Sequence, residues 1–212
     1  MLLVGLTGNI ASGKSTVSAM LAERGAVIVD ADLLAREAVR PGSPALTRIV
    51  ERWGNEVLEA DGSLDRAALR HRVFGDSAEL DALNAIVHPE VERLRNDRVA
   101  AARDAGACVV ICDIPLLFEV HLAERFDAIV LVDAPRPLRL ERLVRDRGLH
   151  EAEAMEMIAA QMPAELKRAR SDYVVDNDTD LRTLAARVEG VWRALAAEAG
   201  CADDATAPDR LS

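Results

Sequence analysis

An α/β fold with a parallel sheet covered by helices on both faces is predicted for this chain of 212 residues. Short apolar runs, typical of buried strands, alternate with longer segments of helical periodicity. Several of these runs end in an aspartate, as at Asp113 and Asp133. A glycine-bearing turn also joins the first strand to the first helix. Because ligands bind beyond the carboxyl ends of parallel strands, these positions are where a site is expected.

The first half of the chain is predicted to hold two strands and several helices. Residues 2–6 and 26–30 are continuous apolar runs and are predicted strands. Helical periodicity predicts four short helices: 16–23, 33–39, 44–53 and 63–72. It continues from 78 to 105, with a break expected at His88-Pro89 because proline inside a helix is costly.

The second half contains the clearest strands. Residues 107–113, 127–133 and 173–176 are predicted strands. The segment between Pro137 and Arg170 is dense in arginine and predicted helical. An amphipathic helix is expected from Asp180 to Ala199. The residues after it are small, polar and acidic, and are predicted to be disordered.

Composition limits the classes of function. The net charge is -10, which argues against broad binding of nucleic acid or acidic membranes. No apolar run is long enough to cross a bilayer, and no signal peptide is recognised, so a cytoplasmic protein is expected. Cys108, Cys112 and Cys201 form no C-x-x-C pair and are predicted to be buried free thiols. Zinc is not expected, since no paired His/Cys ligand set is present.

The most specific motif is the phosphate loop, which we define as Gly8–Ser15. It matches G-x-x-x-x-G-K-[ST] and lies between a predicted strand and a predicted helix. Backbone N–H groups and the helix dipole would favour phosphate there. Lys14 would reach the β- and γ-phosphates, and the Ser15 hydroxyl would bind Mg²⁺. The predicted nucleotide contacts are Gly8, Asn9, Ile10, Ala11, Ser12, Gly13, Lys14, Ser15 and Thr16.

A chance match in an ordinary strand–turn–helix is the alternative. The lysine content argues against it, because only Lys14 and Lys167 among the 26 basic residues are lysines. A compact ammonium suits a phosphate cradle better than a planar guanidinium.

Acidic residues at two other strand ends are candidates for chemistry. Asp30 and Asp32 could act as base and as orienter of a metal-bound water, or either could only cap the following helix. Asp113 could supply a carboxylate on the Mg²⁺ side. The alternative for Asp113 is a strand-end cap before an apolar loop.

Five arginines with a spacing near three follow the strand at 127–133. Most are expected to form solvated ion pairs. Arg142 and Arg139 are the best candidates for cations that close over the γ-phosphate from a mobile lid. His88 alone would more often be structural than catalytic.

Taken together, these motifs resemble the dephospho-CoA kinase family over about residues 1–195. The aspartate pair and His88-Pro89 are among the more specific parts. The motifs are Gly5–Thr16, Asp30–Asp32 with Ala35-Arg36, Pro41-Gly42, Asp61-Gly62, Leu83-Asn84 with His88-Pro89, Asp113–Glu119, Ala159–Gln161 and Asp176-Asn177.

The resemblance implies ATP-dependent phosphorylation of the 3′-hydroxyl of dephospho-CoA, giving CoA and ADP in the last step of CoA synthesis. It implies a P-loop kinase core with a five-stranded parallel sheet, a helical substrate-binding domain and a lid. The nucleotide-binding core would comprise 1–60, 106–135 and 171–199. The helical acceptor domain would be 61–105 and the lid 136–170, followed by a disordered tail at 200–212.

Residue roles follow from the same resemblance. Asp32 matches the general base, Lys14 and Ser15 the phosphate and Mg²⁺ contacts, and Arg142 the lid. Asn177 would border the adenine. The acceptor side would include His88, Asp113, Pro115, Leu116 and Leu117.

The resemblance also implies binding partners, and this chain differs from the family's motifs at a few positions. ATP, Mg²⁺ and dephospho-CoA are the expected small molecules, without nucleic acid or membrane, in a monomer or weak homo-oligomer. The loop departs from the family's Gly-Gly-Ile-Gly at Asn9 and Ala11, but it should still form because Asn tolerates left-handed backbone and Ala is small. Met162 and Pro163 are also unusual and leave the shape of the lid helix open.

Two rival functions remain at this point. One is another P-loop kinase with a small alcohol, nucleoside or nucleotide as acceptor. The other is a GTPase-type switch, but its Asn-Lys-x-Asp run is absent.

Overall fold

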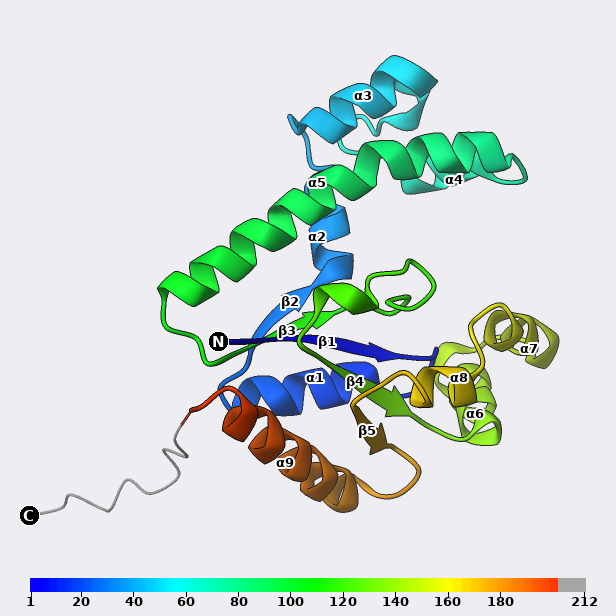
Figure 1. Ribbon diagram of the computed structural model, residues 1–212. Helices are drawn as coiled ribbons and strands as arrows, with labels where there is room; N and C mark the ends of the chain where they lie inside the picture. Colours follow the sequence, from blue (N-terminus) through cyan, green and yellow to red (C-terminus); the bar gives the residue numbers. More distant parts are fainter. Residues whose placement is uncertain (202–212) are drawn as a thin grey trace, which may run out of the picture. The chain divides into compact units, whose positions relative to one another are not determined.

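The structure, a computed structural model, describes residues 1–201 (Figure 1). The chain forms two compact units, Met1–Ile28 with the segment from Ala102 onward, and Val29–Ala101. We call them the first and second unit. The predicted tail lies outside the described residues, apart from Gly200 and Cys201. Within residues 1–201 no helix is both long and apolar enough to span a membrane.

A five-stranded sheet organises the first unit, which confirms the predicted fold class. The strand order is β2-β3-β1-β4-β5, with parallel pairings of β1 with β3, β1 with β4 and β4 with β5. The strands are β1 (Leu2–Gly8), β2 (Val27–Asp30), β3 (Val109–Asp113), β4 (Ala128–Asp133) and β5 (Tyr173–Asp176). Each was predicted from its apolar run, within three residues at either end.

The register of the strands brings their carboxyl ends together. Leu6 pairs with Asp113, and Gly8 pairs with Val132. Asp133 of β4 pairs with Asp176 of β5. The carboxyl ends of β1, β3, β4 and β5 therefore meet at one edge, which Figure 1 shows pointing toward α6–α8.

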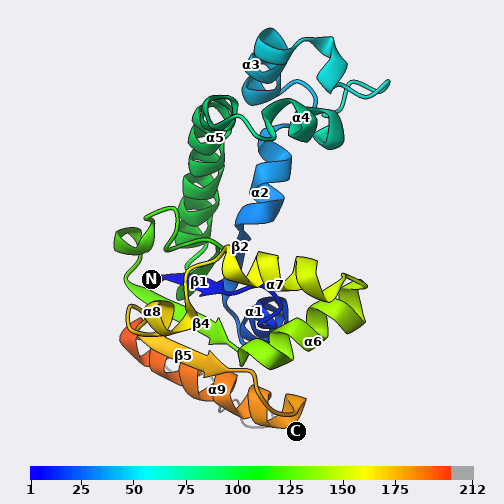
Figure 2. The same cartoon turned by 90° about the vertical axis from the view of Figure 1, so that its right-hand side faces the viewer.

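Within residues 1–201, five helices of the first unit flank this sheet. They are α1 (Lys14–Glu23), α6 (Arg136–Arg147), α7 (Glu151–Ala159), α8 (Ala164–Arg168) and α9 (Leu181–Glu198). Val17 and Leu21 of α1 and Leu184, Val188 and Leu195 of α9 pack against strand residues in one buried core. A short 3₁₀ turn, η2 (Ala123–Arg125), precedes β4. Figure 2 shows α6 and α7 in front of the strands when the sheet is viewed from its carboxyl end.

The second unit is helical. It contains α2 (Ala31–Ala38), α3 (Pro44–Trp53), η1 (Asn55–Val57), α4 (Arg66–Val73) and most of α5 (Ser77–Asp104). Its core holds Val39, Ala45, Ile49, Val57, Leu69, Val73 and Ile86. Val39, just after α2, and residues of α3 and η1 contribute to this core, and residues 29–60 group with residues 61–101.

Two sequence expectations are wrong. Helix α5 continues through Pro89, where a break was expected. Proline lacks the N–H of one helical hydrogen bond, but Leu83, Ile86 and Val87 just before it pack into the core of the second unit.

The second wrong expectation concerns the cysteines. Cys108 and Cys201 form a disulfide, with Cα atoms 6.1 Å apart, while Cys112 is buried, as predicted, and takes no part in it. The fold creates this pairing, because α9 returns the chain to the amino end of β3.

Candidate nucleotide and acceptor site

The phosphate loop forms a tight turn between β1 and α1. Ser12 N donates to Asn9 O at 3.0 Å, and Gly13 caps α1 with φ 87°. The residues that follow, Lys14 and Ser15, therefore open the helix with their N–H groups outside its hydrogen-bond ladder. Such a terminus attracts phosphate oxygens.

Glycine is required at two positions of this loop. A Cβ on Gly8 would lie 2.6 Å from Ser12 Oγ and from Val132 O. A Cβ on Gly13 would overlap the side-chain amide of Asn177. The left-handed backbone between them falls on Ala11, with φ 59°, and not on Asn9. Asn9 is instead 5% exposed, and its Nδ2 donates to Met162 O at 3.3 Å.

Lys14 forms an ion pair with Asp113. Asp113 is 4% exposed and ends β3 beside the loop. A loop cation and a strand-end carboxylate thus lie together. Thr7 Oγ1 also donates to Pro115 O at 3.1 Å, which ties the segment after β3 to β1.

The apolar run after Asp113 divides into core and surface. Leu117 is fully buried and fills the space beside Gly5, where a Cβ would lie 2.5 Å from Leu117 Cδ1. Leu116 is 43% exposed. Of the two, only Leu116 has a side chain that a ligand could contact.

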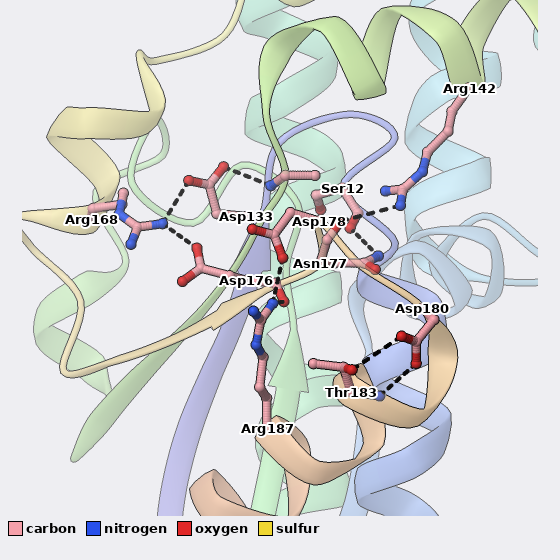
Figure 3. A network of polar contacts seen from close by, with 11 residues as sticks. Ser12, Asp133, Arg142, Arg168, Asp176, Asn177, Asp178, Asp180, Thr183 and Arg187 are labelled. Carbon is pink, nitrogen blue, oxygen red and sulfur yellow. Dashed lines mark hydrogen bonds and ion pairs between the residues drawn. The ribbon is translucent and has the colours of Figure 1, made fainter.

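Arg142 and Asn177 lie against the loop from the other side (Figure 3). Arg142 Nη1 donates to Ala11 O at 3.1 Å, and its Nη2 donates to Asn177 O at 3.2 Å. Asn177 Nδ2 donates to Ser12 O at 2.8 Å. Arg139 is buried, its Nε donates to Ala134 O, and burial lowers the pKa of its guanidinium.

Two further arginines organise the ends of β4 and β5. Arg168 Nη1 contacts Asp133 Oδ2 at 2.9 Å and Asp176 Oδ1 at 2.5 Å (Figure 3). These two hydrogen bonds raise the pKa of Arg168 above its ordinary value. Arg187 holds the next turn through Asp178 Oδ1 at 2.5 Å and through Asp176 O. The sequence analysis identified Asp133 and Asp176 as strand ends, but it did not identify Arg168 and Arg187 as their partners.

The sequence analysis also did not predict the contacts made by the linker between α7 and α8 and by Lys167. Ile10 N donates to Gln161 Oε1 at 2.7 Å, so the linker between α7 and α8 contacts the phosphate loop. Lys167 is fully buried against Glu119. The rarity of lysine could have indicated Lys167, since it is one of two in the chain.

Asp30 ends β2 and Asp32 lies in the first turn of α2, and their side chains have different surroundings. Asp30 Oδ1 accepts from the N–H groups of Asp32 and Leu33 and so caps α2. The Asp32 side chain is exposed and makes no hydrogen bond or ion pair with another described residue. The capping alternative therefore applies to Asp30, and Asp32 keeps a free carboxylate. His88 is also exposed, on α5.

The residues present suit magnesium held jointly with phosphate. No group of three or more His, Cys, Asp or Glu side chains within residues 1–201 could hold a metal by itself. The Ser15 hydroxyl is exposed at the start of α1, and the Asp113 carboxylate lies beside Lys14. Both are hard oxygen donors of the kind that Mg²⁺ takes together with substrate phosphates.

Known proteins resemble this chain along nearly all its length. The family model for dephospho-CoA kinase matches residues 2–183. A Streptomyces avermitilis dephospho-CoA kinase is 52% identical over 196 residues, covering 92% of this chain and 94% of that protein. One from Thermobifida fusca is 45% identical over 195 residues, covering 92% and 96%.

Solved structures agree with the sequence comparison. A crystal structure from Thermus thermophilus has a TM-score of 0.78 and 38% identity, covering 93% of this chain and 97% of its own. A dephospho-CoA kinase from Campylobacter jejuni, at 20% identity, shares the fold with a TM-score of 0.65, covering 91% and 96%. On these matches, the chain belongs to the dephospho-CoA kinase family.

Proposed function

We propose that this chain transfers the γ-phosphoryl group of ATP to the 3′-hydroxyl of dephospho-CoA, releasing CoA and ADP. Membership of the dephospho-CoA kinase family supports the reaction. The single observation that carries the donor site is the phosphate loop at the start of α1, with the Lys14 ammonium beside the Asp113 carboxylate.

On the donor side, the backbone N–H groups of residues 8–16 bind the β- and γ-phosphates. Lys14 moves from Asp113 to the phosphates, because a triphosphate offers it more negative charge than one carboxylate. Ser15 holds Mg²⁺, with Asp113 available beside it. When bound, Mg²⁺ neutralises charge on the phosphate oxygens.

On the acceptor side, Asp32 accepts the proton of the 3′-hydroxyl as its oxygen attacks the γ-phosphorus in line. The bond from that phosphorus to the β–γ bridging oxygen breaks as the new one forms. The unpartnered, exposed carboxylate of Asp32 supports this role, since a base must be free to meet its substrate. His88, Asp113, Pro115, Leu116 and Leu117 form the acceptor side, Leu117 by shaping it from the core.

Arg142 supplies the lid cation, and Asn177 borders the adenine. The contacts of Arg142 with Ala11 O and Asn177 O support this assignment, because they hold a guanidinium next to the loop that would carry the phosphates. Positive charge there would stabilise the negative charge on the equatorial oxygens in the transition state.

The remaining assignments are the partners. The small molecules are ATP, Mg²⁺ and dephospho-CoA, with no nucleic acid or membrane partner. The protein works in the cytoplasm as a monomer or weak homo-oligomer. The net charge of -10 supports the exclusion of polyanionic partners.

The test is ATP-dependent conversion of dephospho-CoA, followed by the mass of the acceptor. One added phosphoryl group, appearing together with ADP, is expected. An acceptor panel of nucleosides, nucleotides and shikimate-like alcohols distinguishes the nearest rival, and ATP against GTP binding tests the switch. Phosphorylation of another acceptor in preference to dephospho-CoA would overturn the proposal.

A further inference from the structure

Helix α8 carries a buried cation that the proposed reaction does not use. Lys167 is 0% exposed, and its Nζ lies 2.8 Å from Glu119 Oε1. The ion pair lacks hydrogen-bond geometry: within residues 1–201, Lys167 Nζ and Glu119 Oε2 are both buried without a hydrogen-bond partner. Since desolvating two charges is expensive, a pair with unmet hydrogen-bonding capacity is poorly explained by stability alone.

The Glu119–Lys167 pair contacts the backbone of the linker between α7 and α8, residues 160–163. Glu119 Oε1 also accepts from Met162 N at 3.1 Å. Burial acts to raise the pKa of Glu119, but the nearby Lys167 ammonium and hydrogen bonds from backbone N–H groups, Met162 included, hold it below its usual value. Glu119 is therefore a charged acceptor at neutral pH. The residue after Met162 is Pro163, the N-cap of α8, which leads into the helix that carries Lys167.

The linker in turn holds the phosphate loop. Gln161 Oε1 accepts from Ile10 N at 2.7 Å, and Met162 O accepts from Asn9 Nδ2 at 3.3 Å. Both contacts reach the two loop residues just before Ala11. A left-handed conformation is unfavourable for a residue with a Cβ, so Ala11 keeps φ 59° only if its neighbours are fixed.

We propose that Glu119 and Lys167 are positioning residues that keep the phosphate loop in its nucleotide-binding form, acting through Met162 and Gln161. The chain of contacts runs from α8 to Glu119, to the linker and to the loop. Neither charged group touches the nucleotide. This inference goes beyond the proposed function and rests on it only in that the loop binds ATP.

Two double variants isolate the acceptor at residue 119. Glu119→Gln/Lys167→Met removes both charges but keeps an oxygen that can accept from Met162 N. Glu119→Leu/Lys167→Met removes the charges and the acceptor at similar volume. We expect the second to bind a non-hydrolysable ATP analogue with Mg²⁺ about tenfold more weakly than the first, because the linker is released. Calorimetry on the full chain without acceptor measures this, and the thermal midpoint is recorded for both.

A merely structural pair would give a different result. It predicts equal affinity for the two double variants, since both remove the same charges, and equality within twofold would overturn the proposal. Gln161→Leu provides an independent variant at a partly exposed position, should the Leu/Met protein not fold. It should weaken analogue binding about tenfold with an unchanged thermal midpoint, and unchanged binding would also overturn the proposal.

Arg193→Met and the wild-type protein serve as controls for these variants. Arg193→Met removes an exposed ion pair with Glu189 on α9 and should leave affinity unchanged. A similar loss in Arg193→Met would overturn the assignment to Glu119 and Lys167. Absence of analogue binding by the wild-type protein would overturn the nucleotide site itself, whereas binding without turnover of dephospho-CoA would contradict only the proposed reaction.

Discussion

The side-chain amide of Asn177 occupies the space that a Cβ on Gly13 would need. Gly13 also has φ 87°, and Asn177 Nδ2 donates to Ser12 O at 2.8 Å. We therefore expect Gly13→Ala to displace Asn177 and the start of α1, and to weaken ATP binding at least tenfold. Overpacking and left-handed strain should together cost about 2–4 kcal/mol of stability. Calorimetric ATP titration and urea unfolding measure the two effects.

Two other glycines serve as matched controls. Gly25 has φ 102° with open space around it, so Gly25→Ala should lose stability but keep ATP affinity. Gly190 lies inside α9, also in open space, and Gly190→Ala should stabilise the protein by about 0.5–1 kcal/mol. Normal ATP affinity in Gly13→Ala would show that the loop does not hold the phosphates in this form.

Asp30 and Asp32 should separate stability from catalysis. Asp30 caps α2, so Asp30→Ala should cost about 1 kcal/mol in stability. Asp32→Asn should leave stability within about 0.5 kcal/mol, because its carboxylate has no partner among the described residues. If Asp32 is the base, its loss should lower kcat about 10²–10⁴-fold with little change in ATP affinity.

Steady-state kinetics with dephospho-CoA and urea unfolding make this comparison. Asp30→Asn is the control, because asparagine also caps helices well and should behave like the wild-type protein. Full turnover by Asp32→Asn would remove the base assignment.

Sequence patterns identified the sheet because its strands are continuous apolar runs, which need no partner to be recognised. The phosphate loop was equally visible, since its glycines and Lys14 lie within a few residues of one another in the chain. Asp30 and Asp32 could not be told apart, because one residue step decides which carboxylate meets the helix N–H groups. Contacts such as Gln161 with Ile10 and Cys108 with Cys201 join positions 151 and 93 residues apart and depend on how the chain returns to the sheet.

The Glu119 carboxylate should make unfolding depend on pH. Its pKa is lowered in the folded protein from an ordinary value of 4.5, through hydrogen bonds that outweigh burial. A lowered pKa means that the unfolded chain binds the proton more tightly, so this contribution is present above about pH 4.5 and is lost as the pH falls through the folded pKa. Urea unfolding of the wild-type protein and of Glu119→Gln/Lys167→Met between pH 7 and pH 3 measures it.

The double variant should lose less stability over that range than the wild-type protein. Asp127, whose side chain accepts from Leu3 N, remains in both proteins, so the difference reports residue 119. Identical pH dependence of the two proteins would contradict the lowered pKa.

The Cys108–Cys201 disulfide should stabilise the first unit under oxidising conditions. It closes a separation of 93 residues, and removing such a link typically costs about 2–5 kcal/mol. We expect Cys201→Ser to unfold at lower urea than the oxidised wild-type protein and at the same urea once both are reduced. Peptide mass mapping without reductant identifies the pair, and Cys112→Ser controls for the loss of a thiol. A free Cys108 in the oxidised protein would contradict this pairing.

Replacing an alanine by glycine usually destabilises a protein, but at Ala11 we expect it not to lower the free energy of unfolding. Its φ of 59° costs roughly 1–2 kcal/mol for a residue with a Cβ, whereas glycine pays about 0.5–1 kcal/mol in chain entropy. Ala11→Gly should therefore leave stability unchanged or raise it by up to about 1 kcal/mol in urea unfolding. Ala186→Gly, at an exposed position inside α9, has no strain to relieve and should lose about 1 kcal/mol. Equal losses of stability in Ala11→Gly and Ala186→Gly would mean that Ala11 is not held in the left-handed conformation. The linker would then not be needed to keep the loop in that form.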